Sequence, residues 1–364
     1  MEGKMLGARA RKVLKEAKIG LVLLLNTNAE DPNFIYATGL LGGLFEGNLL
    51  LITRKGITLF TSPLEYELAK EQLRGGIRVV NLDSKEKLGI LISQVKGKTV
   101  GINGNFVPYN SYRRVKKKLK IRRAVDVSQA FEKARAVKER DEISRIRHAN
   151  RITKAAITMV QKSLKVGMSE KEVAAMFDSL ILKMGADATA FPSIVCFGKN
   201  AALPHHGPDN TRLKYGDFVL IDVGVKVKNY CSDVTRTMIF GNDAGRIKDY
   251  AKKKRIIEVV KEAQRLALLT IRAGVKGEKP HVTAQKYIDS ADKGAYKGTF
   301  IHSLGHSIGI EVHDGSGRFL SAGSKMVLKA GMVSSVEPGI YIPGFGGARF
   351  EDDIMVTKKG YKIL

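Results

Sequence analysis

The sequence predicts a two-domain protein in which an α/β domain is followed by an α+β domain. At 364 residues the chain is longer than one typical domain. Short apolar stretches alternate with helical stretches over residues 18–126. A long charged helical stretch follows, and from about residue 190 the chain is rich in glycine and strand-forming residues. We place the boundary between these two sequence patterns at residue 127, which gives domains of 1–126 and 127–364.

The composition is that of a globular protein of the cell interior. Hydrophobic residues make up 44% of the chain, and no apolar run is long enough to span a membrane. The N-terminal stretch MEGKMLGARARKVLKEAKIG has no apolar segment of the kind found in secretory signals. Two cysteines, Cys196 and Cys231, give no disulfide framework. We therefore expect a cytoplasmic protein with no membrane partner.

The formal net charge of +26 raises the possibility of an anionic partner such as nucleic acid. The basic residues gather in RRVKKKLKIRR at 113–123 and in KKKR at 252–255. No aromatic residue interleaves the longer run, which argues against base stacking. We interpret both runs as solvated faces of helices or sheet edges and expect no specific nucleic-acid partner.

The first domain is predicted to alternate strands and helices, and it contains no candidate catalytic residue. Residues 18–126 contain no histidine, no cysteine and no glycine-rich phosphate loop. The strands are expected at 19–26, 48–61 (a hairpin), 77–82, 99–104 and 122–127, and the helices at 63–73, 84–95 and 111–120.

The second domain begins with helices. The stretch 129–164 is predicted to form one long helix, with Ser128 as its N-cap. A further helix is expected to begin at Ser169, where SEKEV has the pattern of a capping box.

The segment DFVLIDVGVKVKNYCSDVTRTMIF, at 217–240, predicts a strand hairpin that carries two aspartates. A two-residue turn at Val227-Lys228 would place Asp222 opposite Asp233, with Cβ atoms ~5 Å apart. A single aspartate could cap a strand end. Two carboxylates opposed in an apolar strand pair instead require a shared proton or a cation.

A second hairpin is predicted in VSSVEPGIYIPGFGGARFEDDIMV, at 333–356. Glu337 and Glu351 are symmetric about Gly344, so a hairpin centred on this glycine brings the two carboxylates face to face. Arg349 shares a strand face with Glu351 through the two-residue period of a strand and could hold a carboxylate in place.

Three histidines lie in HSLGHSIGIEVHD, at 302–314: His302, His306 and His313. The glycines and β-branched residues of this stretch argue against a helix, and so against a zinc pair on one helical face. We expect one of the three to bind a metal. An oxygen-rich site with one imidazole suits Mn, Co, Fe or Zn, and the four carboxylates of the two hairpins could neutralise two divalent ions in a hydrolytic centre.

These segments together resemble the metal-dependent proline peptidases, namely Xaa-Pro dipeptidases (prolidases) and Xaa-Pro aminopeptidases. HSLGHSIGIEVHD is similar to the family signature, and IDVGVKVKNYCSDVTRT, SSVEPGIY and ARFEDD match its other metal-binding segments in order. The first domain looks like the creatinase-like domain of these enzymes. The resemblance implies a creatinase-like α/β N-terminal domain followed by an α+β pita-bread catalytic domain.

The resemblance also assigns site residues. The implied ligands of two divalent metal ions per chain are Asp222, Asp233, His306, Glu337 and Glu351. The implied cleft and catalytic-site residues are His205 (in LPHHGPDN), His302, His313, Tyr341 and Arg349, with Arg349 beside the ligands. His148 and His281 match nothing in the family pattern, and we expect them to be structural or on the surface. His206, next to His205, has no match either, and we expect it to be exposed to solvent.

The implied reaction is hydrolysis of the bond between an N-terminal residue and a following proline. A hydroxide that bridges two metals would attack the carbonyl carbon, with Glu337 as proton shuttle. His205 or His313 would stabilise the oxyanion. The family resemblance also implies a homodimer in which the N-terminal domain covers the partner's cleft. Residues 31–48 are the candidate covering loop, and burial of this stretch within its own domain is the alternative.

Three alternatives remain at this stage. Methionine aminopeptidases share the metal ligands but not the EPGIY and EVHD segments, and creatine amidinohydrolases share both domains but lack the ligands. A non-catalytic binding module that uses the basic surface is the third.

The chain departs from the family pattern at GSGRFLS, residues 315–321, where an acidic-Gly-Pro sequence is expected. Because this loop borders the cleft, the departure bears on the length of substrate.

Overall fold

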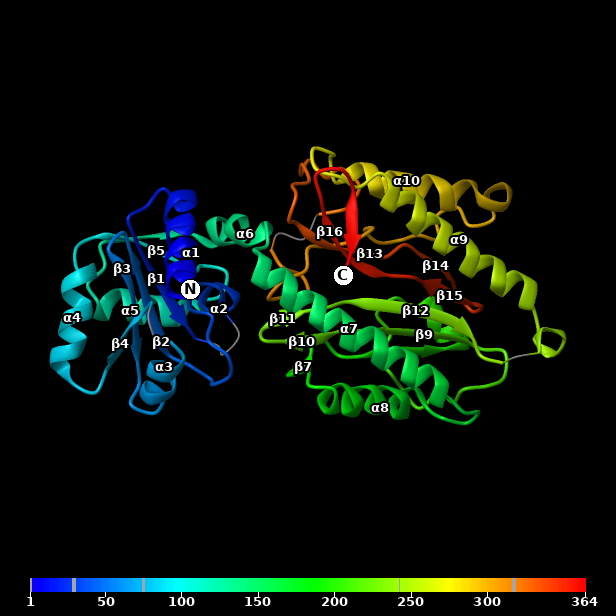
Figure 1. Cartoon of the computed structure of the whole chain (residues 1–364), viewed down its shortest axis with the longest axis horizontal. Coiled ribbons are helices and arrows are strands. Elements are labelled where there is room, and N and C mark those ends of the chain that lie inside the picture. The colour runs from blue at the N-terminus through cyan, green and yellow to red at the C-terminus, as the bar shows by residue number, and fades with distance from the viewer. Residues whose placement is uncertain (1, 28–30, 74–75, 242, 316–318) are drawn as a thin grey trace. The chain divides into compact units, whose positions relative to one another are not determined.

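The computed structural model describes residues 2–27, 31–73, 76–241, 243–315 and 319–364, with side chains from residue 7 onward. The chain divides into two compact units, Met1–Arg135 and Ala136–Leu364 (Figure 1). An α/β unit is followed by an α+β unit, as the sequence predicts.

The first unit is built on a six-stranded mixed sheet with the strand order β4-β3-β2-β1-β5-β6. Strands β1, β2 and β3 pair antiparallel, whereas β1/β5, β3/β4 and β5/β6 are parallel. The strands are β1 Leu21–Asn26, β2 Asn48–Thr53, β3 Gly56–Thr61, β4 Arg78–Asn81, β5 Thr99–Ile102 and β6 Arg123–Asp126. The helices are α1 Glu2–Ala17, α2 Pro32–Thr38, α3 Tyr66–Gln72, α4 Lys85–Val95, α5 Tyr109–Lys118 and α6 Ser128–Ala136.

Helix α6 packs into the first unit, in which Phe131 and Ala134 are fully buried. Its Arg135 donates from Nη1 to Oδ1 of Asn33 at 3.2 Å. The boundary expected at residue 127 falls at the start of this helix, whereas the compact units meet at its end. The prediction of one helix over 129–164 is wrong, because Glu139 and Glu142 form a capping box that starts a new helix, α7 Arg140–Ser163.

The stretch 31–48 divides into a buried and an exposed part. Helix α2 buries Phe34 and Tyr36 within its own unit, and Asp31 caps the helix by accepting from the backbone N–H of Asn33. Leu41 and Leu44 are 38% and 68% exposed. The exposed part of any covering surface is therefore limited to residues after α2.

Helix α5 carries most of the longer basic run on a solvated face. Arg113, Arg114 and Lys117 are exposed, while Leu119 at the helix end is buried in the core of the unit. This amphipathic arrangement agrees with a solvated helix, and the absence of a specific nucleic-acid partner stays a prediction.

The second unit places strands between two pairs of helices, α7 with α8 Glu170–Lys183 and α9 Tyr250–Leu269 with α10 Glu278–Ser290 (Figure 1). Its sheets have the orders β12-β9-β8, β11-β10-β7, β13-β16-β17 and β14-β15. The strands are β7 Ala188–Thr189, β8 Ile194–Phe197, β9 Phe218–Val223, β10 Val225–Val227, β11 Tyr230–Cys231, β12 Val234–Ile239, β13 Val333–Val336, β14 Gly339–Ile342, β15 Gly346–Arg349, β16 Asp352–Val356 and β17 Tyr361–Ile363. Helix α8 begins with the predicted capping box of Ser169 and Glu172.

Two apolar cores lie on opposite faces of strand β9. Val219 and Ile221 pack with the α7–α8 side, and Phe218 and Leu220 pack with the α9–α10 side. Because side chains alternate along a strand, Asp222 points to the same face as Phe218 and Leu220. Among the described helices, none combines the length and apolar character that a membrane crossing requires.

Candidate metal centre

Strand β9 presents Asp222 next to β12, but not opposite Asp233. Asp222 pairs with Thr235, so the predicted register of this hairpin is wrong. The turn is formed by Lys228 and Asn229, which both have positive φ angles of 47° and 69°. Such a turn needs two residues with positive φ, and asparagine adopts this conformation more readily than valine does. The turn therefore lies one residue later than expected.

Asp233 lies just before β12 and still reaches the same cavity as Asp222. Its backbone N–H donates to Oδ2 of Asp353 at 3.0 Å, which fixes the chain where the hairpin bends. Asp353 in turn accepts from Nδ2 of Asn150 on helix α7 at 2.8 Å. The two aspartates converge because of this local anchoring and not because of direct strand pairing.

The second hairpin has the predicted register. Val336 pairs with Asp352 and Gly339 with Arg349, so the ladder is centred on Gly344. Gly344 adopts a φ of 77°, which a residue with a Cβ rarely tolerates. Glu337 and Glu351 lie opposite each other between these pairs, as the sequence predicts.

His306 is positioned by a non-helical segment that packs on strand β13. Its backbone N–H donates to Oγ of Ser335 at 3.1 Å, and its carbonyl accepts from the N–H of Ser335 at 2.9 Å. A Cβ at Gly305 would lie 2.0 Å from the carbonyl oxygen of Ser335, so this approach requires glycine. The imidazole Nε2 then lies 3.5 Å from Oδ2 of Asp233 and 3.3 Å from Oε1 of Glu337.

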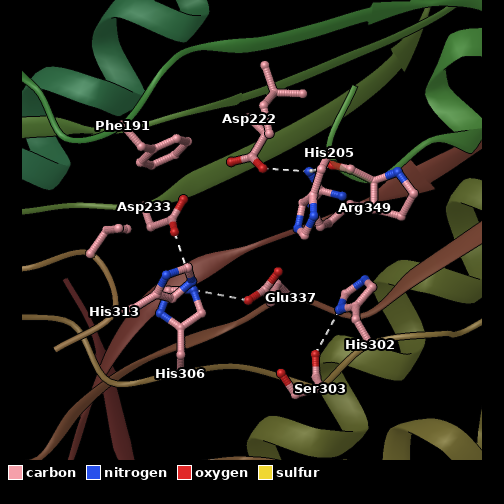
Figure 2. Close-up of a pocket in the computed structure, with 13 residues that line it drawn as sticks. Phe191, His205, Asp222, Asp233, His302, Ser303, His306, His313, Glu337 and Arg349 are labelled. Carbon is pink, nitrogen blue, oxygen red and sulfur yellow. Dashed lines mark hydrogen bonds and ion pairs between the residues drawn. The ribbon is translucent and has the colours of Figure 1, made fainter. Parts of the chain in front are cut away.

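These residues surround a cavity of about 310 Å³ (Figure 2). It is lined by Phe191, Ile194, Pro204, His205, Asp222, Asp233, His302, Ser303, His306, Val312, His313, Glu337 and Arg349. Of the residues predicted from the sequence, only Glu351 and Tyr341 do not line it. Both are buried beside it, and Glu351 comes close enough to Asp233 and His306 for one ligand atom of each to surround an ion.

The carboxylates have oxygen atoms that lack any partner. Oδ1 of Asp222, Oδ1 of Asp233 and Oε1 of Glu351 are buried and accept no hydrogen bond within the described part of the chain. A buried carboxylate oxygen without a partner is unfavourable by the desolvation free energy of that group. Oxygen donors that converge with one imidazole nitrogen have the chemistry of a divalent metal site, and the residues therefore fit such an ion.

The electrostatics of the site also indicate that a cation fits among these carboxylates. Burial, followed by the charge of Asp222, raises the pKa of Asp233 well above its usual value. Burial together with the charges of Asp233 and Glu337 does the same for the pKa of Glu351. These carboxylates cannot all ionise without a positive charge among them.

His306 lies among these carboxylates and carries the opposite charge when it is protonated. Burial lowers the pKa of His306, but hydrogen bonds to Asp233 and Glu337 outweigh burial and raise it well above its usual value. Burial raises the pKa of Glu337, but its contact with His306 prevails and lowers the pKa to about 2. A bound metal would replace the proton, because a coordinating imidazole must be neutral.

Arg349 connects the carboxylates to the cleft. Its guanidinium donates from Nη2 to Asp222, from Nη1 to the hydroxyl of Tyr341 at 2.7 Å and from Nε to Thr235 at 3.2 Å. Tyr341 also contacts Nε2 of His302 at 2.8 Å. Burial raises the pKa of Tyr341 to about 12, so its hydroxyl stays protonated and His302 accepts the hydrogen bond.

The remaining histidines divide into two groups. His205 and His313 both line the cavity, and the ring of His313 lies 4.1 Å from that of His306, centroid to centroid. His148 is exposed, and His281 is buried against Phe300. The expectation that His206 is exposed to solvent is wrong, because its side chain is 16% exposed and its Nε2 lies 3.0 Å from Oε2 of the fully buried Glu170.

Sequence reasoning missed two residues of the site. Thr235 donates from Oγ1 to Oε2 of Glu351 at 2.6 Å, and it lies two residues after Asp233. Asp353 holds the backbone of Asp233, and it lies two residues after Glu351. Strand alternation places Thr235 on the same face as Asp233, and Asp353 on the same face as Glu351. The ligand that each of them contacts lies on the other strand, and the sequence does not show that contact.

Comparisons with known proteins identify the class of enzyme that this fold and site define. Residues 144–358 match the model of metallopeptidase family M24, and residues 8–137 match the Creatinase/Prolidase N-terminal domain. The chain belongs to metallopeptidase family M24, and the resemblance stated from the sequence is confirmed.

Relatives are similar over nearly the whole chain. An Xaa-Pro dipeptidase of Pyrococcus horikoshii is 35% identical over 337 residues, which cover 92% of this chain and 91% of that protein. A solved Xaa-Pro dipeptidase from Bacillus anthracis superposes with a TM-score of 0.87 at 33% identity, covering 99% of this chain and 97% of that one. An X-Pro aminopeptidase from Thermotoga maritima gives a TM-score of 0.84 at 30% identity, with coverages of 98% and 96%. The creatinase-like and pita-bread domains are thereby confirmed.

Proposed function

We propose that the protein hydrolyses the peptide bond between an N-terminal residue and a following proline, with two bound divalent metal ions. The observation that carries the proposal is that four of the five proposed ligands line one cavity with Arg349 and three further histidines, while the fifth, Glu351, lies within reach of Asp233 and His306. Relatives named as Xaa-Pro dipeptidases and an X-Pro aminopeptidase support the substrate class. A non-catalytic binding module is set aside, because the chain belongs to an enzyme family.

The ligands proposed for the two ions are Asp222, Asp233, His306, Glu337 and Glu351. This set is rich in oxygen and includes one imidazole, which suits Mn, Co, Fe or Zn. Once bound, the ions would supply a water acidic enough to lose a proton near neutral pH and a positive charge beside the scissile carbonyl.

The protein's own residues would bind and orient the substrate around that centre. Glu337, which lines the cavity beside His306, is the candidate to take a proton from water and return it to the leaving nitrogen. His205 and His313, both on the cavity wall, are the candidates to donate to the carbonyl oxygen as it gains charge. Arg349 would hold Asp222 in place, and Tyr341 would orient His302.

Selection of proline would rest on the apolar part of the cavity. Phe191, Ile194 and Val312 line it together with the polar groups. A proline ring is compact and apolar, and its tertiary amide has no N–H that would be left without a partner on such a wall. A secondary amide at this position would bury an unpaired donor.

Assembly and location complete the proposal. We propose a homodimer, supported by the apolar side chains of Leu41 and Leu44 that the first unit leaves exposed. We also propose a cytoplasmic location, because Cys196 and Cys231 are unpaired and buried. The departure at 315–321 stays a prediction about substrate length, and residues 316–318 lie outside the described part of the chain.

A panel of peptides tests this function. The purified protein is incubated with Mn, Co, Fe or Zn and assayed on Xaa-Pro dipeptides, Xaa-Pro-Yaa tripeptides, matched Xaa-Ala peptides and Met-Ala peptides. We expect cleavage only where proline follows the N-terminal residue, and the ratio of dipeptide to tripeptide turnover decides between dipeptidase and aminopeptidase. Preferred cleavage of Met-Ala peptides would instead favour methionine aminopeptidase-like activity.

A further inference from the structure

Two consecutive histidines of the 203–211 loop have opposite environments. His205 lines the cavity, as described above. His206 is turned toward helix α8, where its Nε2 lies 3.0 Å from Oε2 of Glu170. The side chain of His206 is 16% exposed and that of Glu170 is fully buried. One residue of the pair therefore faces the site and the next one anchors the loop.

Glu170 is the residue to which this loop and its flanking segment are tied. It is the first residue of α8, directly after the Ser169 N-cap. Its carboxylate lies within hydrogen-bond distance of four nitrogen donors. They are the backbone N–H of Phe197 at 2.7 Å, Nδ2 of Asn200 at 3.0 Å, the backbone N–H of Asp209 at 3.0 Å and Nε2 of His206 at 3.0 Å.

The same loop also completes the start of the helix. The carbonyl of Thr211 accepts from the N–H of Glu170 at 3.1 Å, and that of Asp209 accepts from the N–H of Lys171 at 3.2 Å. The N–H groups of the first helical turn have no partners within the helix itself, so the loop stabilises α8 while α8 holds the loop.

This cluster is a clamp and not a second metal site. Glu170, His206 and Asp209 come close enough to hold an ion. However, an ionised carboxylate has about four acceptor positions, and four N–H donors already fill those of Glu170. Nε2 of His206 faces Oε2 of Glu170 and also lies 3.1 Å from Nδ2 of Asn200. Because the two hydrogens of that Nδ2 are directed to Glu170 and to Oγ1 of Thr211, the tautomer with the proton on Nε2 satisfies His206 and Glu170, and leaves that nitrogen no free electron pair for a metal.

We propose that Glu170 and His206 are positioning residues that hold Pro204 and His205 against the catalytic cavity. The carbonyl of Pro204 accepts from Nη2 of Arg349 at 3.4 Å, so the clamped loop also contacts the network around Asp222. This inference rests on the proposed function, because it assigns to the clamp the placement of a residue that acts on the substrate. His205 therefore lies between two held residues, Pro204 and His206, and this restricts it to a narrow range of positions.

The expected effect follows from the role of His205. Removing a group that orients a catalytic residue typically lowers activity by about 10- to 100-fold. His206→Ala should lower kcat in that range with little change in KM or metal content. His206→Gln should recover much of the loss, because the amide nitrogen of glutamine can reach the same oxygen of Glu170. His148→Ala, at an exposed histidine of helix α7, is the matched control.

A double-substitution cycle separates positioning from general destabilisation. If His206 acts through His205, the loss in kcat/KM caused by His206→Ala should vanish in a His205→Ala background. A purely structural role would give the same fold-loss in both backgrounds and would contradict the proposal. Glu170→Gln extends the test, and His206→Gln keeps it decisive if the Glu170 variant does not fold.

Hydrogen exchange provides a readout that does not depend on activity. In His206→Ala, amides of the 203–211 peptide should exchange at least about ten times faster than in the unsubstituted protein. Those of the α8 interior should not change. Unchanged loop exchange would overturn the inference even for an inactive enzyme. Conversely, suppose that loop exchange is faster in His206→Ala but the unsubstituted protein cleaves no Xaa-Pro peptide. The proposed function would then be wrong, whereas the role of Glu170 and His206 in holding the loop would be supported. A metal at Glu170 that is lost with His206→Ala would also contradict the clamp.

Discussion

The Nε2 atom of His306 lies 3.3 Å from Oε1 of Glu337. This contact joins the non-helical histidine segment to the end of strand β13. Because His306 also approaches Asp233, a single imidazole faces two carboxylates. Only a shared proton or a cation can stabilise such a group of buried charges, and the raised pKa values of Asp233 and Glu351 are the consequence.

Replacing Glu351, one of the proposed metal ligands, should remove metal binding and activity together. Glu351→Gln keeps the shape of the side chain but removes its charge and one oxygen donor. We expect less than about 1% of the unsubstituted activity and a reduced metal content by elemental analysis. The variant should stay folded, because the carboxylate it replaces is unfavourable in the metal-free protein.

Glu262→Gln is the matched control for this change, because Glu262 pairs on the surface with Arg265. Its activity and metal content should equal those of the unsubstituted protein. Full activity of Glu351→Gln would show that Glu351 is not a required ligand.

Arg349→Lys should impair catalysis although it keeps the positive charge. The guanidinium contacts Asp222, Tyr341 and Thr235 at once, and a single ammonium group cannot reach all three. We expect kcat/KM to fall by about 10- to 100-fold, measured on an Xaa-Pro dipeptide. Arg265→Lys on the surface should have no effect, and an active Arg349→Lys enzyme would reduce the role of the arginine to charge alone.

The two hairpins show how far sequence patterns determine this site. The register around Gly344 could be predicted because a glycine-rich turn leaves one symmetric arrangement. Around Lys228 two adjacent residue pairs satisfy the alternation, and the preference of Asn229 for positive φ is the one sequence signal that favours the turn observed. Even so, Asp222 and Asp233 reach one cavity, since diagonal neighbours on a hairpin share a face.

The clamp around Glu170 could not be predicted. SEKEV indicates the start of a helix, and this prediction is confirmed. Nothing in that motif shows that the first glutamate accepts hydrogen bonds from residues 197–209. His206 matches no family position, yet its partner Glu170 is fully buried. Local patterns give the position of a residue along an element, whereas its partners depend on the tertiary arrangement.

The buried ion pair of Lys138 and Asp314 should be essential for stability. The Nζ atom lies 3.0 Å from Oδ2 of Asp314 and 3.1 Å from Oγ of Ser307, and both charged side chains are 1% exposed. Lys138→Met removes the cation that Asp314 contacts at 3.0 Å. We expect the free energy of unfolding in urea to fall by about 3–5 kcal/mol.

The double variant Lys138→Met/Asp314→Asn tests the cause of that loss. Because it removes both charges, it should be more stable than Lys138→Met alone. If the double variant is instead less stable than the single one, packing around the lysine and not the loss of its ion pair with Asp314 determines the effect.

Asp31 in the N-terminal unit should make the stability depend on pH. Burial raises the pKa of Asp31 from 3.8 to about 6 in the folded chain, despite the hydrogen bond from the N–H of Asn33. Between these two values the folded protein holds a proton that the unfolded chain has lost. The free energy of unfolding should therefore fall as pH rises from about 4 to about 6, by up to about 3 kcal/mol.

Urea unfolding of the unsubstituted chain and of Asp31→Asn at several pH values measures this effect. The amide does not titrate, so the variant should lose this part of the pH dependence. Two parallel curves over this range would show that Asp31 is ionised in the folded protein.

Metal titration of the chelator-treated protein tests the central claim most directly. The protein is stripped of metal, and Mn, Co, Fe or Zn is added back stepwise while bound metal and hydrolysis of an Xaa-Pro dipeptide are measured together. Activity should be absent at first and should rise with metal until two ions are bound per chain. Full hydrolysis by the metal-free protein, or saturation with metal and no cleavage of any Xaa-Pro peptide, would contradict the account.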